Sequence, residues 1–438
     1  MLITPIDTAS EQGRRQLAGL QARFHSADDR CREAVTGIIA NVRENGDNAL
    51  LQYTRQFDDP DFSKDRLRVT EQELAEAMAQ VPPDLLATLD LAIDRIRSFH
   101  ERERQQSLIV TGENGVITGR LVQPVDAAGL YVPGGQGGRT PLVSSVLMNG
   151  IPAAIAGVGR RIMVTPPGPG GKIHPALLVA AQKIGITEIY RTGSAWAIAG
   201  LAYGTATIAP VDVIVGPGNQ YVTEAKRQVN GRVRIDMIAG PSEVLIIADE
   251  TANPAYIAAD MLAQAEHDPL ALAILVTTHL DIAHETVYQL ELQLKTLDRQ
   301  SIARTSIRDH GVMLIVDDLH QAIGIANQIA AEHLELMVRN PFEWLPLIRH
   351  AGAIFLGNHT PEAVGDYVAG PNHVLPTMGT ARYSSSLSVD TFIKKSSLIS
   401  YSRAAFAADS AHIIRLAELE GLTAHAASIK VRLEEIKK

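Results

Sequence analysis

From Ala127 onward, short apolar runs rich in β-branched residues alternate with stretches whose apolar residues recur every three or four positions. This alternation is typical of βαβ units and a largely parallel sheet. It occurs in two successive blocks, so the pattern predicts two α/β layers. In the first block the expected strands are residues 129–132, 161–165, 188–192 and 211–215, and the expected helices are residues 175–184, 195–203 and 221–229.

The second block repeats the alternation with its own apolar core. Its expected strands are residues 244–248, 271–276, 312–316 and 353–356, separated by expected helices at residues 256–265, 281–297 and 319–331. The preceding region is instead mostly helical by pattern, with helices expected at residues 47–57, 71–80 and 82–102. We expect this helical region to pack against the second block.

The tail beyond Ser384 has a different character. A strand-like piece lies around residues 387–389, followed by helical patterns at residues 404–420 and 424–437. So small an appendage has little core of its own, so it is expected to dock as an arm on another surface, within the chain or on a partner chain.

Composition narrows the class of protein. The 438 residues are 46% hydrophobic and 20% charged, a globular mixture, and 49 acidic against 40 basic residues give a net charge of −9. The sequence contains no block of Lys and Arg residues that could bind along a phosphate backbone, so nucleic acid is not an expected partner. The longest apolar runs fall far short of the roughly 20 residues that a membrane span needs. The first residues show no secretory signal pattern, so a cytoplasmic protein is expected.

The single cysteine, Cys31, excludes an intramolecular disulfide and a multi-cysteine zinc site. A metal would therefore need nitrogen and oxygen ligands. Gln264 and His267 lie three apart on an expected helix and could share one ion, although a solvated helix face is the ordinary explanation. Asp366 and His373 lie in a Gly/Pro-rich loop, where they could bind a ligand or simply form a turn with a surface histidine.

Other candidate residues allow acid–base chemistry. Glu332 and His333 end an expected helix and could divide proton transfers, although a histidine in a last helical turn is also favoured by the helix dipole. Glu420 and His425 flank Gly421, which should break a helix in the tail. For both residues a position on the solvated surface is the ordinary explanation.

Searches for phosphate-binding loops are negative. No Walker spacing is present, and no G-x-G-x-x-G follows an expected strand. Residues 216–219 (Gly-Pro-Gly-Asn) follow an expected strand directly and could approach a phosphate or ribose, or form a plain turn.

Taken in order, several motifs resemble those of the histidinol dehydrogenase family from about residue 30 to the end. The matching stretches are residues 129–135 (GLYVPGG), 144–149 (SSVLMN), 215–219 (VGPGN), 239–245 (AGPSEVL), 264–267 (QAEH), 331–335 (AEHLE), 370–376 (GPNHVLP) and 420–422 (EGL).

The resemblance implies roles for particular residues. It implies one zinc ion per subunit, with Gln264, His267, Asp366 and His425 as ligands. It implies Glu332 and His333 as the acid–base pair. The implied substrate contacts are Ser242, Gln264, His267, His333, Asp366, His373, Glu420 and His425, and the implied NAD contacts are Tyr131 and Asn219.

The activity implied is a two-step, NAD-linked oxidation of L-histidinol through histidinal to L-histidine, the last step of histidine biosynthesis. The family forms homodimers whose C-terminal arms cross, which would put Glu420 and His425 in the other subunit's active site. Two departures bear on the cofactor: the Gly-rich loop at residues 136–140 is longer than in many relatives, and Trp196 replaces a common glutamine. An indole could still stack on the nicotinamide ring.

The fold expected is α/β, with two incomplete Rossmann-like domains containing parallel sheets and a small helical and extended arm formed by the termini. Residues 28–130 and 238–380 would form the first domain, with most metal and catalytic residues, and residues 131–237 the second, on the cofactor side. Residues 1–27 and 381–438 would form the dimerisation arm.

Two other functions stay open. A dehydrogenase of the same fold could act on another amino alcohol or a small diol, and a non-enzymatic metal-binding or scaffold protein would also lack a Rossmann fingerprint. The ligand set would accept manganese or cobalt as well as zinc.

Overall fold

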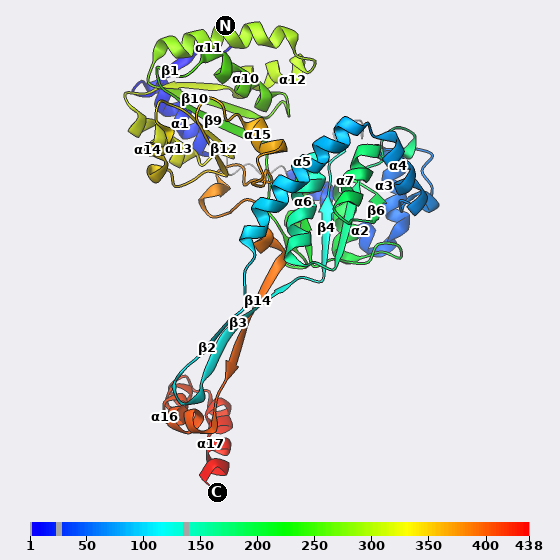
Figure 1. Cartoon of the computed structure of the whole chain (residues 1–438), viewed down its shortest axis with the longest axis vertical. Helices are drawn as coiled ribbons and strands as arrows, with labels where there is room; N and C mark the ends of the chain where they lie inside the picture. The colour runs from blue at the N-terminus through cyan, green and yellow to red at the C-terminus, as the bar shows by residue number, and fades with distance from the viewer. Residues whose placement is uncertain (1, 23–28, 135–139, 438) are drawn as a thin grey trace. The chain divides into compact units, whose positions relative to one another are not determined.

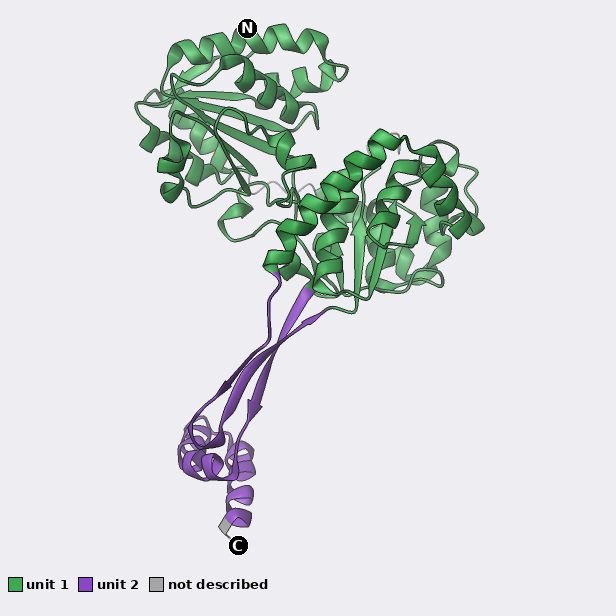
Figure 2. Ribbon diagram, in the orientation of Figure 1, with its two compact units in different colours: residues 1–103, 125–392 green, residues 104–124, 393–438 purple. Residues whose placement is uncertain are grey.

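The computed structural model describes residues 2–22, 29–134 and 140–437. The chain divides into two compact units, each built from segments far apart in the sequence (Figure 2). Unit 1 comprises residues 1–103 and 125–392, and unit 2 comprises residues 104–124 and 393–438. None of the helices within the described ranges combines the length and apolarity that crossing a bilayer requires.

Unit 1 contains a six-stranded sheet in which every pairing is parallel (Figure 1). In sheet order its strands are β1 (Pro5–Asp7), β11 (Val312–Ile315), β10 (Leu272–Thr277), β9 (Glu243–Ala248), β12 (His333–Met337) and β13 (Ala353–Leu356). Apart from the added edge strand β1, the order in the chain is third, second, first, fourth, fifth. Val244 and Ile246 of β9 face one core while Leu245 and Ile247 face another, which is why its sequence is continuously apolar.

Helices cover both faces of this sheet. The helices on one face are α10 (Pro254–Ala265), α11 (Leu280–Gln293) and α12 (Gln300–His310), and those on the other are α1 (Glu11–Ala22) and α13 (Leu319–Ile329) with the short α14 (Pro341–Trp344). Local chemistry sets their starts. The Asn253 side chain caps α10, with Pro254 at the first helical position, and the Asp318 side chain caps α13.

A five-stranded parallel sheet in unit 1 has the same strand order. Its strands are β6 (Glu188–Arg191), β5 (Arg160–Thr165), β4 (Ala127–Tyr131), β7 (Val213–Val215) and β8 (Arg234–Ile235). One face is covered by α2 (Asp29–Asn45), α3 (Asp47–Phe57), α8 (Ser194–Tyr203) and α9 (Gln220–Val229), and the other by α4 (Glu71–Gln80), α5 (Pro83–His100), α6 (Val143–Ala156) and α7 (Pro175–Lys183).

The expectation that residues 28–103 pack against the second block is wrong. Val35 and Leu50 share a core with strands β4 and β5, and Ile93 and Ile96 lie in the core on the opposite face of the same sheet. Helical periodicity shows that one face of a helix is buried, but it does not specify the surface that buries it.

Unit 2 is an antiparallel three-stranded sheet followed by two helices. In sheet order the strands are β14 (Ile393–Ser400), β3 (Ile117–Pro124) and β2 (Leu108–Thr111), and the helices are α16 (Arg403–Leu419) and α17 (Thr423–Lys437). Gly421 ends α16 with φ of 72°, as its sequence position predicts.

The α/β class, the parallel sheets and the helical and extended arm are as predicted, but the domain boundaries differ. Residues 1–27 were assigned to the arm; instead β1 joins the six-stranded sheet, and Leu20 of α1 lies in its core. Residues 104–124, assigned to the first domain, belong to unit 2.

The arm also begins later than expected. Residues 387–389 do not form the predicted strand, and a 3-10 turn follows at Val389–Phe392. Leu387 and Phe392 are buried in a unit 1 core, so residues 381–392 belong to that unit, and the strand begins at Ile393.

Candidate functional site

The amino-terminal ends of β9 and β12 adjoin each other, with His333 aligned to Val244. Helix α13 ends at Ile329, and Ala330 adopts a left-handed conformation (φ 51°) that turns the chain into β12. The prediction that Glu332 and His333 lie at a helix end is therefore wrong, because His333 is the first residue of an interior strand. Both side chains are buried.

The environment of His333 fixes its tautomer. Its Nδ1 lies 3.0 Å from the backbone oxygen of Glu243. Since a carbonyl oxygen only accepts hydrogen bonds, Nδ1 carries the proton and Nε2 holds the lone pair. Burial lowers the pKa of His333 to about 4, which keeps the ring neutral near pH 7. The side chain is thus prepared to accept a proton at Nε2.

Glu332 lies beside this histidine. Its Oε2 accepts the backbone N–H of Glu243 at 3.0 Å and is 3.9 Å from Nδ1 of His333. Ser242 also hydrogen-bonds to the Glu332 side chain. Burial raises the pKa of Glu332 well above its usual value, despite the hydrogen bonds that favour the charged form. The carboxyl group can therefore exchange a proton under conditions where exposed glutamates stay ionised.

Gln264 lies in the last turn of α10, completely buried. One side of its amide faces Oε2 of Glu362 at 3.0 Å and the backbone oxygen of Glu243 at 3.2 Å. Nδ1 of His333 lies on the same side at 3.1 Å and carries a proton, so this side offers partners both to an NH2 group and to an amide oxygen. With the NH2 group on this side, the amide oxygen turns to the other side, where it can serve as a ligand.

Asp366 lies in the short helix α15 (Glu362–Tyr367), where a loop was expected. Its Oδ1 is 3.3 Å from Nδ1 of His373. Burial alone would raise the pKa of Asp366, but the hydrogen bond and the charge of His373 outweigh it and lower the pKa below the usual value. Asp366 is therefore ionised at neutral pH.

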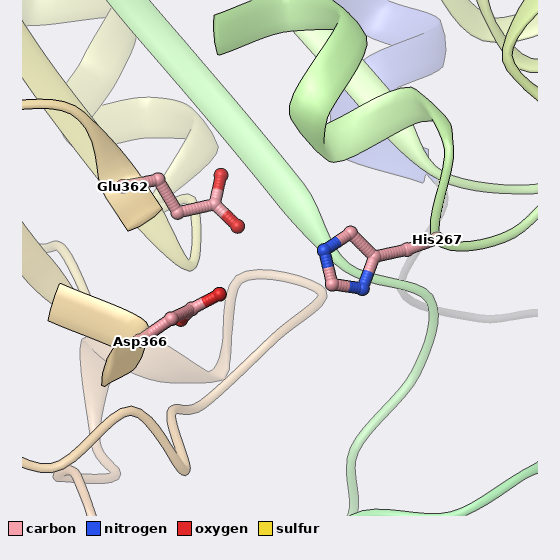
Figure 3. Close-up of side chains that lie close together, drawn as sticks. All are labelled: His267, Glu362 and Asp366. Atoms are coloured by element: carbon pink, nitrogen blue, oxygen red, sulfur yellow. The ribbon is translucent and has the colours of Figure 1, made fainter. Parts of the chain in front are cut away.

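Figure 3 shows the imidazole of His267 turned toward two carboxyl groups of α15, those of Glu362 and Asp366. One potential ligand atom from each of the three residues lies within 4.8 Å of the others. This nitrogen and oxygen set suits zinc and would accept manganese or cobalt. His267 and Asp366 were predicted as metal ligands, whereas Glu362 was missed. It precedes Asp366 by four residues, a spacing that would have indicated a shared face had the helix been recognised.

Two further buried carboxyl groups lie beside these residues and were also missed. Asp260 precedes Gln264 by one turn of α10, and Glu335 follows His333 by two positions, on the same face of β12. Burial raises the pKa of both carboxyl groups, and the charge of Asp260 raises that of Glu335 further.

The residues expected to contact NAD lie at the carboxyl ends of β4 and β7, two adjacent strands. Tyr131 ends β4, is buried, and accepts the N–H of Ser194 at its hydroxyl oxygen (3.2 Å). Asn219 caps α9, where its Oδ1 accepts from the N–H groups of Tyr221 (3.1 Å) and Val222 (3.2 Å). The cap uses the amide oxygen of Asn219. The residue is exposed, so its amide nitrogen can donate a hydrogen bond to solvent or to a ligand.

Trp196 does not offer an open ring to a cofactor, contrary to expectation. It is only 4% exposed, and its indole stacks on Tyr53 and Phe57 of α3, with ring centroids 5.5 and 5.6 Å away. The aromatic side chains of α3 thus occupy the surface that a nicotinamide would need. Of the longer Gly-rich loop, residues 136–139 lie outside the described residues.

Glu420 and His425 belong to unit 2, at the end of α16 and in α17, and both are exposed. The three-residue cluster of His267, Glu362 and Asp366 comes wholly from unit 1.

Comparison with known proteins identifies the family. The model of the histidinol dehydrogenase family matches residues 21–433. A histidinol dehydrogenase of Desulfotalea psychrophila is 64% identical over 434 residues, which cover 99% of this chain and 100% of that protein. The chain belongs to the histidinol dehydrogenase family.

Other members of the histidinol dehydrogenase family agree in sequence and fold. A histidinol dehydrogenase of Thermosynechococcus vestitus is 52% identical over 96% of this chain and 98% of its own length. The crystal structure of histidinol dehydrogenase from Elizabethkingia anophelis matches with a TM-score of 0.92 and 38% identity, covering 100% of this chain and 99% of that one. Membership of this family makes the protein an oxidoreductase and confirms the family inferred from the sequence motifs.

Proposed function

We propose that this protein oxidises L-histidinol through histidinal to L-histidine with two molecules of NAD, as the last step of histidine biosynthesis in the cytoplasm. The single observation that carries the proposal is a neutral, buried His333 paired with Glu332 beside a group of potential metal ligands. The acid–base pair supplies proton transfer, and the cluster supplies a place to orient a nitrogen-rich substrate.

The two residues have successive roles. Nε2 of His333 accepts the hydroxyl proton of histidinol while a hydride passes to the first NAD. Glu332 then removes a proton from the water that adds to histidinal, and the second hydride leaves for the second NAD. The tautomer of His333 and the raised pKa of Glu332 support this division of work.

A divalent cation, in our proposal zinc, fits this group. Gln264, His267 and Asp366 would hold one ion per subunit together with His425 of a second copy, and Glu362 adjoins them as a further oxygen donor. When bound, the ion serves as a template that orients the substrate's imidazole and amino nitrogens. Further substrate contacts are proposed for Ser242, which already touches Glu332, and for His373 and Glu420.

NAD is proposed to bind at the carboxyl edge of the five-stranded sheet. The strand order reverses between β4 and β7, and open α/β sheets bind ligands in the crevice at such a reversal. Tyr131 and Asn219 stand on its two sides. The amide nitrogen of Asn219 is the atom that can donate to the cofactor.

We further propose a homodimer that exchanges its arms. Unit 2 exposes large apolar side chains on both its sheet and its helices, such as Ile109 at 60%, Ile399 at 71% and Leu419 at 82%. So much exposed apolar surface on a small unit indicates a contact with another chain. A second copy would cover it and bring Glu420 and His425 to the other subunit's metal ligands.

The activity is tested by the stoichiometry of NADH formation together with metal analysis of the purified protein. We expect two NADH per histidinol consumed and one metal ion per subunit. A stoichiometry of one, or faster turnover of another amino alcohol or a diol than of histidinol, would contradict the proposal. A protein that binds metal but forms no NADH would favour the scaffold alternative.

The arm is tested by deleting residues 393–438. A cut at residue 384 would also remove Leu387, Val389 and Phe392 from the core of unit 1, so the later cut isolates the arm's own effect. The truncated protein should be monomeric and should lose zinc during dialysis. His425→Ala, the matched point variant, should stay dimeric and lose zinc. A monomeric truncation that keeps its zinc would refute the exchange.

A further inference from the structure

The buried carboxyl group of Glu335 joins two elements that each carry site residues. Glu335 lies on β12 two residues after His333. Its Oε1 accepts the backbone N–H of Glu362, the first residue of α15, at 2.9 Å. We propose that Glu335 is a positioning residue that holds α15 so that Glu362 and Asp366 face His267.

Helix α15 needs such a device because it is short and poorly capped. It has six residues, and the residue before it, Pro361, makes no side-chain capping hydrogen bond. The first N–H groups of a helix have no partner within the helix, so they must be satisfied from outside. Glu335 does this from a neighbouring strand, and its carboxyl group takes the place of a cap residue. The start of α15 is thereby fixed to the interior of the sheet.

The carboxyl group of Glu335 is costly to bury. Glu335 is 1% exposed, and Asp260, which lies on α10 one turn before Gln264, is 9% exposed. Apolar residues of similar volume would pack here without the cost of burying carboxyl groups. What the carboxyl group of Glu335 provides, and an apolar residue cannot, is an acceptor for the N–H group at the start of α15.

The proposal rests on the metal site proposed above, and Co²⁺ alone serves as the probe. Glu335→Gln keeps an acceptor for the N–H of Glu362. Glu335→Ala removes this acceptor, and Glu335→Leu removes it while filling the space. Changes to residues that orient metal ligands weaken metal binding by about 10- to 100-fold.

We expect the Ala and Leu variants to bind Co²⁺ at least about tenfold more weakly than the parent protein, with an altered visible absorption band of the bound ion. The Gln variant should bind Co²⁺ within about threefold of the parent, with an unchanged band. A folded Leu variant that binds Co²⁺ as tightly as the parent would overturn the proposal.

Asp249→Ala is the matched control. Asp249 is also buried, lies directly after β9 at the opposite edge of the same sheet, and accepts the N–H groups of Arg339 (2.8 Å) and Thr251 (2.9 Å). It should lose thermal stability as Glu335→Ala does, but keep the parent's Co²⁺ affinity. An equal loss of Co²⁺ affinity in both variants would show a general effect of instability and overturn the positioning role. Failure of the parent itself to bind Co²⁺ would instead refute the proposed metal site.

Discussion

The two parallel sheets of unit 1 share one strand order but place their candidate functional residues at opposite edges. In the five-stranded sheet, Tyr131 ends β4 and Asn219 follows β7, at the carboxyl edge where open α/β sheets usually bind ligands. In the six-stranded sheet, Ser242 precedes β9, Glu332 precedes β12 and His333 begins it, at the amino edge. Two sheets with the same strand order therefore place their candidate functional residues at different edges.

The segments that follow the strands differ between the two carboxyl edges. In the six-stranded sheet the carboxylate of Asp249 binds the N–H groups of Thr251 and Arg339, which ties the segments after β9 and β12 together. In the five-stranded sheet the segment after β7 lies directly against β4, because a Cβ on Gly216 would lie 2.1 Å from the backbone oxygen of Tyr131. The connecting segments thus differ although the strand orders agree.

The contrast between the two sheets requires that residues at the amino edge of the six-stranded sheet contribute to catalysis. His333→Ala should lower kcat by about 10²- to 10⁴-fold, the usual contribution of a general base, while zinc content stays at the parent's level. His279→Ala changes an exposed histidine at the carboxyl edge of the same sheet and should leave kcat within about twofold. Steady-state NADH formation by both variants shows which edge of the six-stranded sheet contributes to catalysis.

A smaller effect should separate the two residues of the amino edge. Glu332→Gln removes the group assigned to water activation, so it should slow oxidation of histidinal by about 10²-fold and oxidation of histidinol by clearly less. Single-turnover measurements starting from each substrate give the two rates. An equal loss in both steps contradicts the assigned roles.

The carboxyl edge of the five-stranded sheet can be tested without disturbing the fold. Asn219→Ser retains a side-chain acceptor that can cap α9 but removes the amide nitrogen. We expect the KM for NAD to rise about tenfold, the value of one lost hydrogen bond, with an unchanged melting temperature. Asn219→Ala, as the matched variant, should show the same KM and an additional loss of about 1 kcal/mol of stability. An unchanged KM in both would leave Asn219 with a capping role alone.

The smallest effect concerns the turns that lead into β7 of the five-stranded sheet and β12 of the six-stranded sheet. The five-stranded sheet has Gly204 at the end of α8, with φ of 78°, whereas the six-stranded sheet has Ala330 at the end of α13, with φ of 51°. Alanine is strained there, so Ala330→Gly should stabilise the protein by about 1 kcal/mol in denaturant unfolding. Gly204→Ala should destabilise it by at least as much, and a destabilised Ala330→Gly would contradict this reading of the turn.

The sequence predicts the regular parts of the fold well because their signals are local. The strands β9, β10 and β11 are uninterrupted apolar runs, as strands buried on both faces should be. Strand β12 was missed because His333 and Glu335, to which we assign roles in the candidate site, interrupt its apolar pattern.

The site is harder to predict from spacing because its residues come from separate elements. Gln264 and His267 could be paired by helical periodicity, but nothing in the sequence alone connects them with Asp366. The family motifs supplied that connection. Glu362 and Glu335 lay outside the recognised roles, and only the fold of α15 against β12 reveals them.

The pairing of β3 with β14 extends over eight residue pairs between segments separated by more than half of the chain. During synthesis the hairpin of β2 and β3 leaves the ribosome early. It lacks its third strand until residues 393–400 have also been synthesised. A polypeptide released before that point lacks the completed arm as well as Glu420 and His425. Under the arm exchange that we propose, such a chain could neither dimerise nor complete a neighbour's active site, so it would not inactivate full-length molecules.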